Sequence, residues 1–203
     1  MKKITLSLLV SLALSASAFA EDTSDKTFDG DFYVGIGYGY TDNSNKIGNV
    51  DTDASTNNVL IQAGYDFNKY IGIEARLWEG VGGTDATQTG GLFPGTYDVS
   101  DSYAWGAYVK PQFPILDSLN VYGMLGYAVT SLKYNGTDTS TDGFSWGLGA
   151  EYYILDNSSL FVDYVNLGSQ DSATFVYVPS GATQDTSASI DVYSVNVGIK
   201  YKF

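Results

Sequence analysis

The chain ends with the ten residues SVNVGIKYKF, Ser194–Phe203. Every second residue from Val195 to Phe203 is apolar, while Lys200 and Lys202 lie between them. Strict alternation over this length predicts a β-strand with one apolar face and one polar face. The end of a soluble chain usually frays into water through polar residues. Because this strand instead stops on an aromatic residue, we expect Phe203 to be ordered and to occupy a fixed position in the fold.

The same alternation recurs along the chain and predicts eight strands. They lie at about 31–41, 57–67, 71–80, 102–113, 119–134, 143–154, 159–167 and 190–203. One face of each is apolar or aromatic, and the other carries many glycines with isolated charges. A soluble sandwich turns a polar face outward, without this glycine content. We therefore expect the polar face inside, where glycine leaves room for long side chains, and the apolar face outside, as in transmembrane β-barrels.

The connections between these strands alternate in length. The short ones are 68–69, 114–118 and 155–159, and the long ones are 42–56, 81–101, 135–142 and 168–189. Outer-membrane barrels join their strands by short periplasmic turns and longer external loops. The sequence thus predicts an all-β fold, an eight-stranded antiparallel up-and-down transmembrane β-barrel with both chain ends on the periplasmic side.

The first 20 residues differ from the rest. Lys2 and Lys3 precede a short apolar core that ends in Ala18-Phe19-Ala20, the organisation of a secretory signal peptide. The core is too short and too interrupted by serine for a membrane-spanning helix, which needs about 20 apolar residues. We expect a cleaved signal peptide at 1–20, a short acidic lead at 21–30 and an outer-membrane barrel at 31–203.

Composition excludes several function classes. The chain has no Cys and no His, so it lacks disulfides, the commonest general base and the usual zinc ligands. Its formal net charge of −13 argues against a nucleic-acid partner, because phosphate binding needs basic patches. We expect no catalytic residue, no metal and no cofactor, and therefore no enzyme.

Six charged residues fall on the inward faces and are the candidate site. They are Glu74, Arg76, Lys110, Glu151, Asp163 and Lys200. Charges in a barrel interior must pair or be costly, so they predict either a salt-bridge plug, which we favour, or a gate whose partners exchange. Glu151 and Asp163 could also suggest paired catalytic carboxylates, but an eight-stranded interior is filled by side chains and leaves a substrate no access.

The long connections are acidic. The stretches VDTDAS at 50–55 and TDTSTDG at 137–143 hold oxygen ligands of the kind that Ca²⁺ prefers, without the EF-hand spacing. A solvated surface is the favoured interpretation. Apolar residues at 92–94 and 175–178 are expected to rest on the rim or to contact a partner. The second run alternates poorly, and an alternative is that it extends the last two predicted strands beyond the membrane.

Three stretches carry a resemblance to a known family. GAEYYILDNSSLFVDYVNLGSQD (149–171), YVKPQFPILDSLNVYGMLGYA (108–128) and GYDFNKYIGIEARL (64–77) resemble strands and turns of the OmpA/OmpX-type small outer-membrane barrels. The resemblance covers nearly all of 31–203 as a pattern and identifies no single member. It implies a barrel alone, without the periplasmic peptidoglycan-binding domain of full-length OmpA-type proteins.

The same resemblance assigns roles to individual residues. It implies a gate formed by Glu74, Lys110 and Asp163, with Arg76 as the candidate for the family's interior arginine, although its position is not a clean match. It also implies that the final strand, with Gly198, Tyr201 and Phe203, is the signal read by the outer-membrane insertion machinery.

We therefore expect an integral protein of the cell outer membrane with a structural or surface-interaction role. Its expected partners are outer-membrane lipid and lipopolysaccharide, the insertion machinery during assembly, and an external ligand at the loops. Two alternatives remain open: a narrow porin-like or gated pore for ions and small solutes, and an adhesin that binds host factors.

Overall fold

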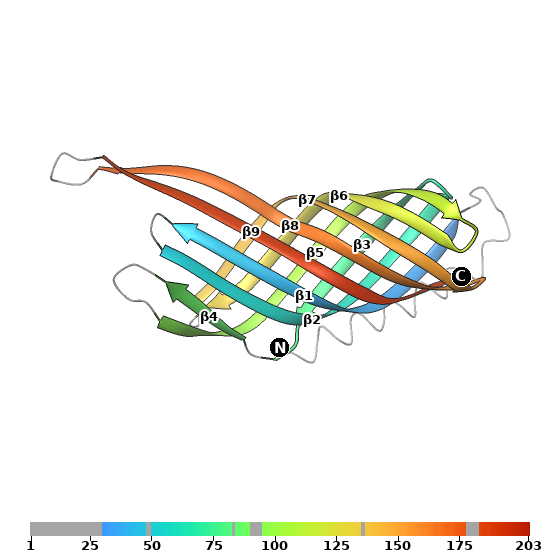
Figure 1. Cartoon of the computed structure of the whole chain (residues 1–203), viewed down its shortest axis with the longest axis horizontal. Helices are drawn as coiled ribbons and strands as arrows, with labels where there is room; N and C mark the ends of the chain where they lie inside the picture. The colour runs from blue at the N-terminus through green and yellow to red at the C-terminus, as the bar shows by residue number, and fades with distance from the viewer. Residues whose placement is uncertain (1–29, 48–49, 83, 90–94, 135–136, 178–182) are drawn as a thin grey trace.

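The part of the chain that the structure describes forms an elongated β-structure made almost entirely of antiparallel strands (Figure 1). The computed structural model describes residues 30–47, 50–82, 84–89, 95–134, 137–177 and 183–203. Its strands are β1 (Asp31–Ile47), β2 (Val50–Asn68), β3 (Ile71–Gly80), β4 (Thr84–Thr89), β5 (Gly95–Leu116), β6 (Leu119–Tyr134), β7 (Thr137–Leu155), β8 (Ser158–Tyr177) and β9 (Thr183–Lys202). The expected signal peptide and most of the acidic lead lie outside the described residues.

Eight of these strands close into a barrel. Neighbours in sequence pair in turn, with β3 pairing to β5, and β1 pairs with both β2 and β9. The last strand is bound on both edges, since Tyr201 pairs with Val34 of β1 and with Ser158 of β8. The amide of Phe203 also donates to the carbonyl of Phe32 at 2.9 Å. Closure removes the open edges that cannot lie in lipid, which confirms the predicted eight-stranded barrel.

The short strand β4 was not predicted, and it continues the line of β3. The chain leaves β3 at Gly80, and Gly82 has φ +90°, a left-handed conformation that glycine adopts readily. Past this break, β4 lies between β2 and β5, as β3 does below it. The barrel wall therefore keeps eight positions around its circumference.

The strands run well past their predicted ends on one side of the barrel. The expected loop at 42–56 is a hairpin paired from Thr41–Thr56 to Ile47–Val50, and β8 and β9 remain paired as far as Tyr177 and Thr183. Figure 1 shows this β8–β9 ribbon running beyond the other strands. Apolar alternation reports only the part of a strand whose outer face meets lipid, so it stops where the polar extensions begin.

The outer face is apolar, with aromatic residues gathered at two levels. Exposed side chains include Ile36, Leu148 and Val197, at 53, 63 and 55%.

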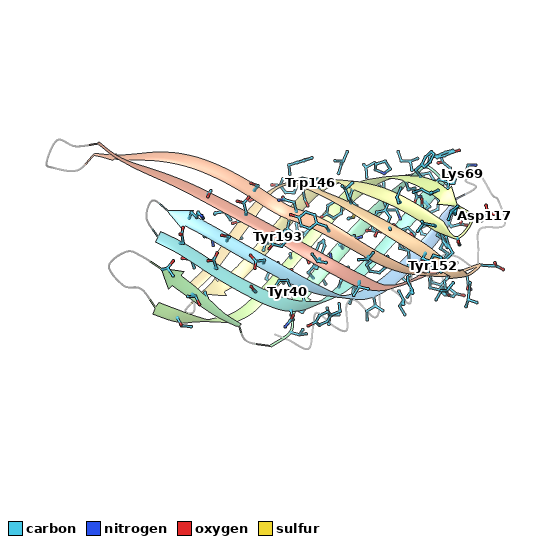
Figure 2. The ribbon with its side chains drawn as sticks, in the orientation of Figure 1. Tyr40, Lys69, Asp117, Trp146, Tyr152 and Tyr193 are labelled. Carbon is cyan, nitrogen blue, oxygen red and sulfur yellow. The ribbon has the colours of Figure 1, made fainter. Side chains whose placement is uncertain are left out.

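Near the short turns, Tyr201 and Phe203 pack edge to face with ring centroids 5.2 Å apart. At the other level, Trp146, Tyr164 and Tyr193 form a row across β7, β8 and β9, with successive centroids 5.8 and 5.6 Å apart. Figure 2 shows Trp146 and Tyr193 far along the barrel from Lys69 and Asp117 at the short turns. Two aromatic levels around an apolar band match the girdles of outer-membrane barrels. Among the described residues, no helix is long and apolar enough to cross a membrane.

Candidate functional site: a charged network inside the barrel

All six candidate charges lie inside the barrel. Exposure is 3% or less for each of Glu74, Arg76, Lys110, Glu151, Asp163 and Lys200. Glu74 and Arg76 come from β3, Lys110 from β5, Glu151 from β7, Asp163 from β8 and Lys200 from β9. Strand alternation thus brings side chains from most of the circumference into one interior layer.

Arg76 is the centre of this layer. Its Nη1 and Nη2 atoms donate to Asp163 Oδ1 and Oδ2 at 3.0 and 2.8 Å, and its Nε donates to Glu74 Oε1 at 2.5 Å. A guanidinium that engages a carboxylate through two parallel bonds holds it in a defined geometry. Tyr122 and Asn196 also donate to Asp163, at 2.8 and 2.9 Å, so both oxygens of this carboxylate are occupied.

Lys110 reaches Glu74 mainly through a tyrosine. Its Nζ donates to the hydroxyl of Tyr33 at 2.8 Å, and that hydroxyl donates to Glu74 Oε2 at 2.6 Å. The direct distance from Lys110 Nζ to Glu74 Oε2 is 3.7 Å, longer than the 3.3 Å to Asp66 Oδ1. The short ion pair of Glu74 is therefore with Arg76. Sequence analysis did not select Asp66 or Tyr33.

Lys200 and Glu151 form the second pair. Lys200 Nζ lies 2.7 Å from Glu151 Oε2, and Ser159 Oγ donates to Glu151 Oε1 at 2.5 Å. The Lys200 ammonium also lies 4.6 Å from the ring centroid of Tyr33, and Lys110 lies 4.2 Å from the same ring. Both cations thus lie close enough to one aromatic ring to be attracted by it.

The network is electrically balanced. The ion pairs among the described residues involve the acids Asp66, Glu74, Glu151 and Asp163 and the bases Arg76, Lys110, Lys200 and Lys202. Four charges of each sign cancel. Because every one of them has a partner within 4 Å, the interior avoids the large penalty of an isolated buried charge.

Glycine makes room for this packing, as the sequence suggested. A Cβ at Gly64 would collide with the end of the Tyr33 ring, and one at Gly149 would lie 2.5 Å from Cζ of Tyr122 and 2.7 Å from Cβ of Asp163. These two tyrosines are the ones that hydrogen-bond Glu74 and Asp163. The glycines therefore allow the rings to lie flat against the wall and reach the network.

An apolar layer, which sequence analysis missed, covers the network on the side away from the short turns. It is a buried cluster that includes Leu60, Trp78, Met124, Val165, Leu167 and Val192. On β3, Trp78 lies beyond Arg76, and on β8, Val165 lies beyond Asp163, counted from the short turns. Unbroken apolar runs such as Val59-Leu60-Ile61 could have indicated this layer. Such a run is typical of a strand segment with apolar surroundings on both faces.

The predicted C-terminal residues lie at the closing seam. Gly198 faces inward, where an added Cβ would lie 2.6 Å from Cα of Gly37, while Tyr201 and Phe203 are 45 and 47% exposed on the outer face. Among the described residues no group of three or more acidic side chains is placed to hold a metal ion. The apolar residues at 92–94 lie outside the described residues.

Comparison with known proteins gives one family. Residues 6–203 match the family described as "Outer membrane protein beta-barrel domain". No curated protein sequence matches the chain.

Solved structures with a similar fold are small barrels. They include the outer membrane protein AlkL (13% identity, 87% of this chain and 91% of that one, TM-score 0.59) and Neisserial surface protein A (18%, 85% and 97%, TM-score 0.53). Another is Ail of Yersinia pestis, solved with the heparin analogue sucrose octasulfate (16%, 85% and 99%, TM-score 0.50). At sequence identities this low, the similarity to these structures shows a shared fold alone.

Proposed function

Because the chain belongs to the outer-membrane protein β-barrel domain family and lies in the outer membrane, we propose that it is a closed, non-catalytic barrel. Its role is structural and surface-interactive. The membrane part anchors the protein in lipid and lipopolysaccharide, and the strand extensions beyond the outer aromatic level contact partners outside the cell.

The observation that carries this proposal is the double closure of the interior. The charged layer around Arg76 is paired and 0–3% exposed, and the apolar layer with Leu60 and Trp78 lies over it. A hydrophobic constriction excludes water and ions even without charges, so a solute would have to pass two independent barriers. A stable plug of this kind suits an anchor better than a channel.

Charge indicates the kind of external partner. The four segments at 42–56, 81–101, 135–142 and 168–189, which form most of the strand extensions on the side away from the short turns, hold ten acidic residues and one basic residue, Lys46. Ail was solved with a sulfated saccharide, but a polyanion would be repelled by this acidic surface. We therefore propose a cationic external partner, because complementary charge steers association and excludes other partners.

Two measurements test the closed barrel and its surface role. In planar bilayers the refolded mature chain should give no regular conductance steps, whereas steady channels would contradict the plug. Cells that display the protein should bind a lysine-rich peptide more than heparin, and replacing Asp51 and Asp53 by Asn should reduce that binding. Equal binding of both probes would contradict the charge argument.

A gated pore is the second candidate, favoured by one contact. Glu74 has Lys110 at 3.7 Å as an alternative partner to Arg76, so its carboxylate could exchange between two cations. Conductance of the Arg76→Met and Lys110→Met variants distinguishes the candidates. Channels that appear in either variant while the apolar layer is intact would favour the gate, and silence in both would favour the plug.

The final strand has a proposed role in assembly. Phe203 and Tyr201 lie exposed at the closing seam, where they are accessible before β9 pairs with β1. This supports the proposal that Gly198, Tyr201 and Phe203 belong to the signal that the outer-membrane insertion machinery reads.

A further inference from the structure

The seam between β7 and β8 opens on the side of the barrel away from the short turns. Backbone pairing between these two strands runs from Leu155–Ser158 to Trp146–Asn166 and goes no further among the described residues. Both strands nevertheless continue, β7 back to Thr137 along β6 and β8 on to Tyr177 along β9. Beyond Asn166, therefore, β8 pairs with β9 alone in the part of the chain that the structure describes, and its other edge has no strand partner there.

A bulge in β8 marks the point of separation. The register between β8 and β9 shifts between Asn166 and Gly168, where the pairing passes from Tyr193 to Val192. A bulge bends its strand and increases the local twist, so β8 and β9 leave the wall together as a two-stranded ribbon. Figure 1 shows this ribbon running beyond the other strands.

The direction of the backbone groups in the ribbon follows from the register. The amide of Lys202 donates to the carbonyl of Asn157 at 2.8 Å, so the even-numbered residues of β9 direct their N–H and C=O groups toward β8. Past the bulge these residues lie opposite even-numbered residues of β8, from Gly168–Val192 to Val176–Gln184. The residues of β8 that alternate with them turn their backbone groups to the other edge. They are Ser169, Asp171, Ala173, Phe175 and Tyr177.

This edge lacks the usual protection against strand pairing. Natural proteins blunt exposed edge strands with lysine, proline, a bulge or a very short length. Residues 169–177 have the sequence SQDSATFVY, with no Lys and no Pro, and the register with β9 does not shift over them. Thr, Phe, Val and Tyr are residues that favour strands. The edge is therefore long, regular and able to pair with another strand.

Charge decides which strand this edge can accept. Residues 168–193 include Asp171, Asp185 and Asp191 and no Lys or Arg. A second copy of the chain would bring two acidic ribbons together, and these repel each other. We propose that the β8 edge at 169–177 is a docking site for an extended cationic peptide segment, which adds a third strand to the ribbon by β-augmentation. This docking site rests on the proposed cationic partner and specifies the conformation in which that partner binds.

The test follows amide hydrogen exchange by NMR in ¹⁵N-labelled protein in micelles. The probe is a nonapeptide of alternating Lys and Thr, which is long enough to span residues 169–177. In the free protein the five outward amides should exchange much faster than those that bond to β9, at Gln170, Ser172, Thr174 and Val176. Saturating peptide should slow exchange of the outward amides by about tenfold or more, and it should leave the second set unchanged.

The matched control is the same peptide methylated on every backbone nitrogen. It keeps the lysine charges but has no N–H donors for strand pairing, so it should give no protection. Binding of both peptides with the five amides still exchanging rapidly would overturn the docking site and leave the cationic partner supported. Failure of both peptides to bind would contradict the cationic partner as well.

Other occupants of the edge have their own signatures, and each would overturn the proposal. Equal protection by an uncharged nonapeptide of Ser and Thr would show that charge does not select the strand. Protection that is present without peptide and disappears on dilution would identify a second copy of the chain as the occupant.

A pair of variants tests the position of the peptide. Asp171→Asn should weaken its binding about threefold, as expected for one exposed ion pair. Asp117→Asn removes the same charge at an exposed short turn at the opposite end of the barrel, and it should leave the affinity unchanged. Equal affinities of the two variants would contradict docking along β8.

Discussion

Arg76 binds Asp163 through two parallel hydrogen bonds that join β3 to β8 across the barrel interior, Nη1 to Oδ1 at 3.0 Å and Nη2 to Oδ2 at 2.8 Å. The two residues are 87 positions apart in sequence. Neither side chain has any solvent exposure. This contact links opposite parts of the wall that share no backbone pairing, so it should contribute to the rigidity of the whole barrel.

Removal of the Arg76 charge is the first prediction. Arg76→Met leaves Glu74 and Asp163 without their short ion pairs, and breaking a buried pair costs on the order of 3–5 kcal/mol. Urea unfolding in detergent or lipid vesicles should therefore show a clear loss of stability. Arg76→Lys should recover part of it, because the charge remains while the planar fork is lost. Lys69→Met, at an exposed turn, is the control and should change little. A loss no larger than that of the control would contradict the central place of Arg76.

The second prediction concerns the coupling energies that double-mutant cycles measure for two ion pairs. The energy should be larger for Arg76 with Asp163 than for Lys110 with Glu74. Residues in one network show interaction energies of about 0.5–3 kcal/mol. The cycle with Arg76→Met and Asp163→Asn should lie near the upper limit. The cycle with Lys110→Met and Glu74→Gln should give less, because Tyr33 mediates that contact and Asp66 also holds Lys110. The opposite order would mean that Lys110, and not Arg76, is the principal partner of Glu74.

The third prediction is that glycine at position 64 is needed because its missing side chain leaves space for the Tyr33 ring inside the barrel. Gly64→Ala places a Cβ against the Tyr33 ring and within 2.5 Å of the carbonyl oxygen of Ile73, so it should destabilise the barrel by about 1–3 kcal/mol, as overpacking does. The nearest atom to a Cβ at Gly123 is 3.6 Å away, an ordinary contact. Gly123→Ala should therefore be neutral in the same unfolding measurement. Equal effects of the two substitutions would show that the interior adjusts freely.

Deletion of Phe203 separates assembly from stability and is the fourth prediction. The residue is 47% exposed and contributes one backbone hydrogen bond to Phe32, so refolding in detergent should be nearly normal. In cells the deletion should lower the amount of folded protein in the outer membrane if Phe203 belongs to the proposed insertion signal. Folded levels equal to the wild type would show that the machinery does not need this residue.

The apolar and polar alternation of the strands was readable from the sequence because it is local. A period of two decides which side of the wall each residue takes, and this placed Arg76 and Glu74 inside and Val197 outside before any contact was known. The same pattern gave the eight barrel strands and their closure by β9. It did not reveal most of the strand extensions, because a strand in water needs no apolar face, and only the apolar run at 175–178 indicated that the last two strands continue beyond the membrane.

Only the tertiary structure decided which interior residues meet. Two inward side chains on distant strands come together according to the stagger between strands around the barrel and the length of each side chain. Periodicity carries neither quantity, so it could not show that Arg76 Nε lies 2.5 Å from Glu74 Oε1 while Lys110 Nζ lies 3.7 Å from Glu74 Oε2. For the same reason the apolar layer of Leu60 and Trp78 appears only once the wall is closed and its side chains face one another.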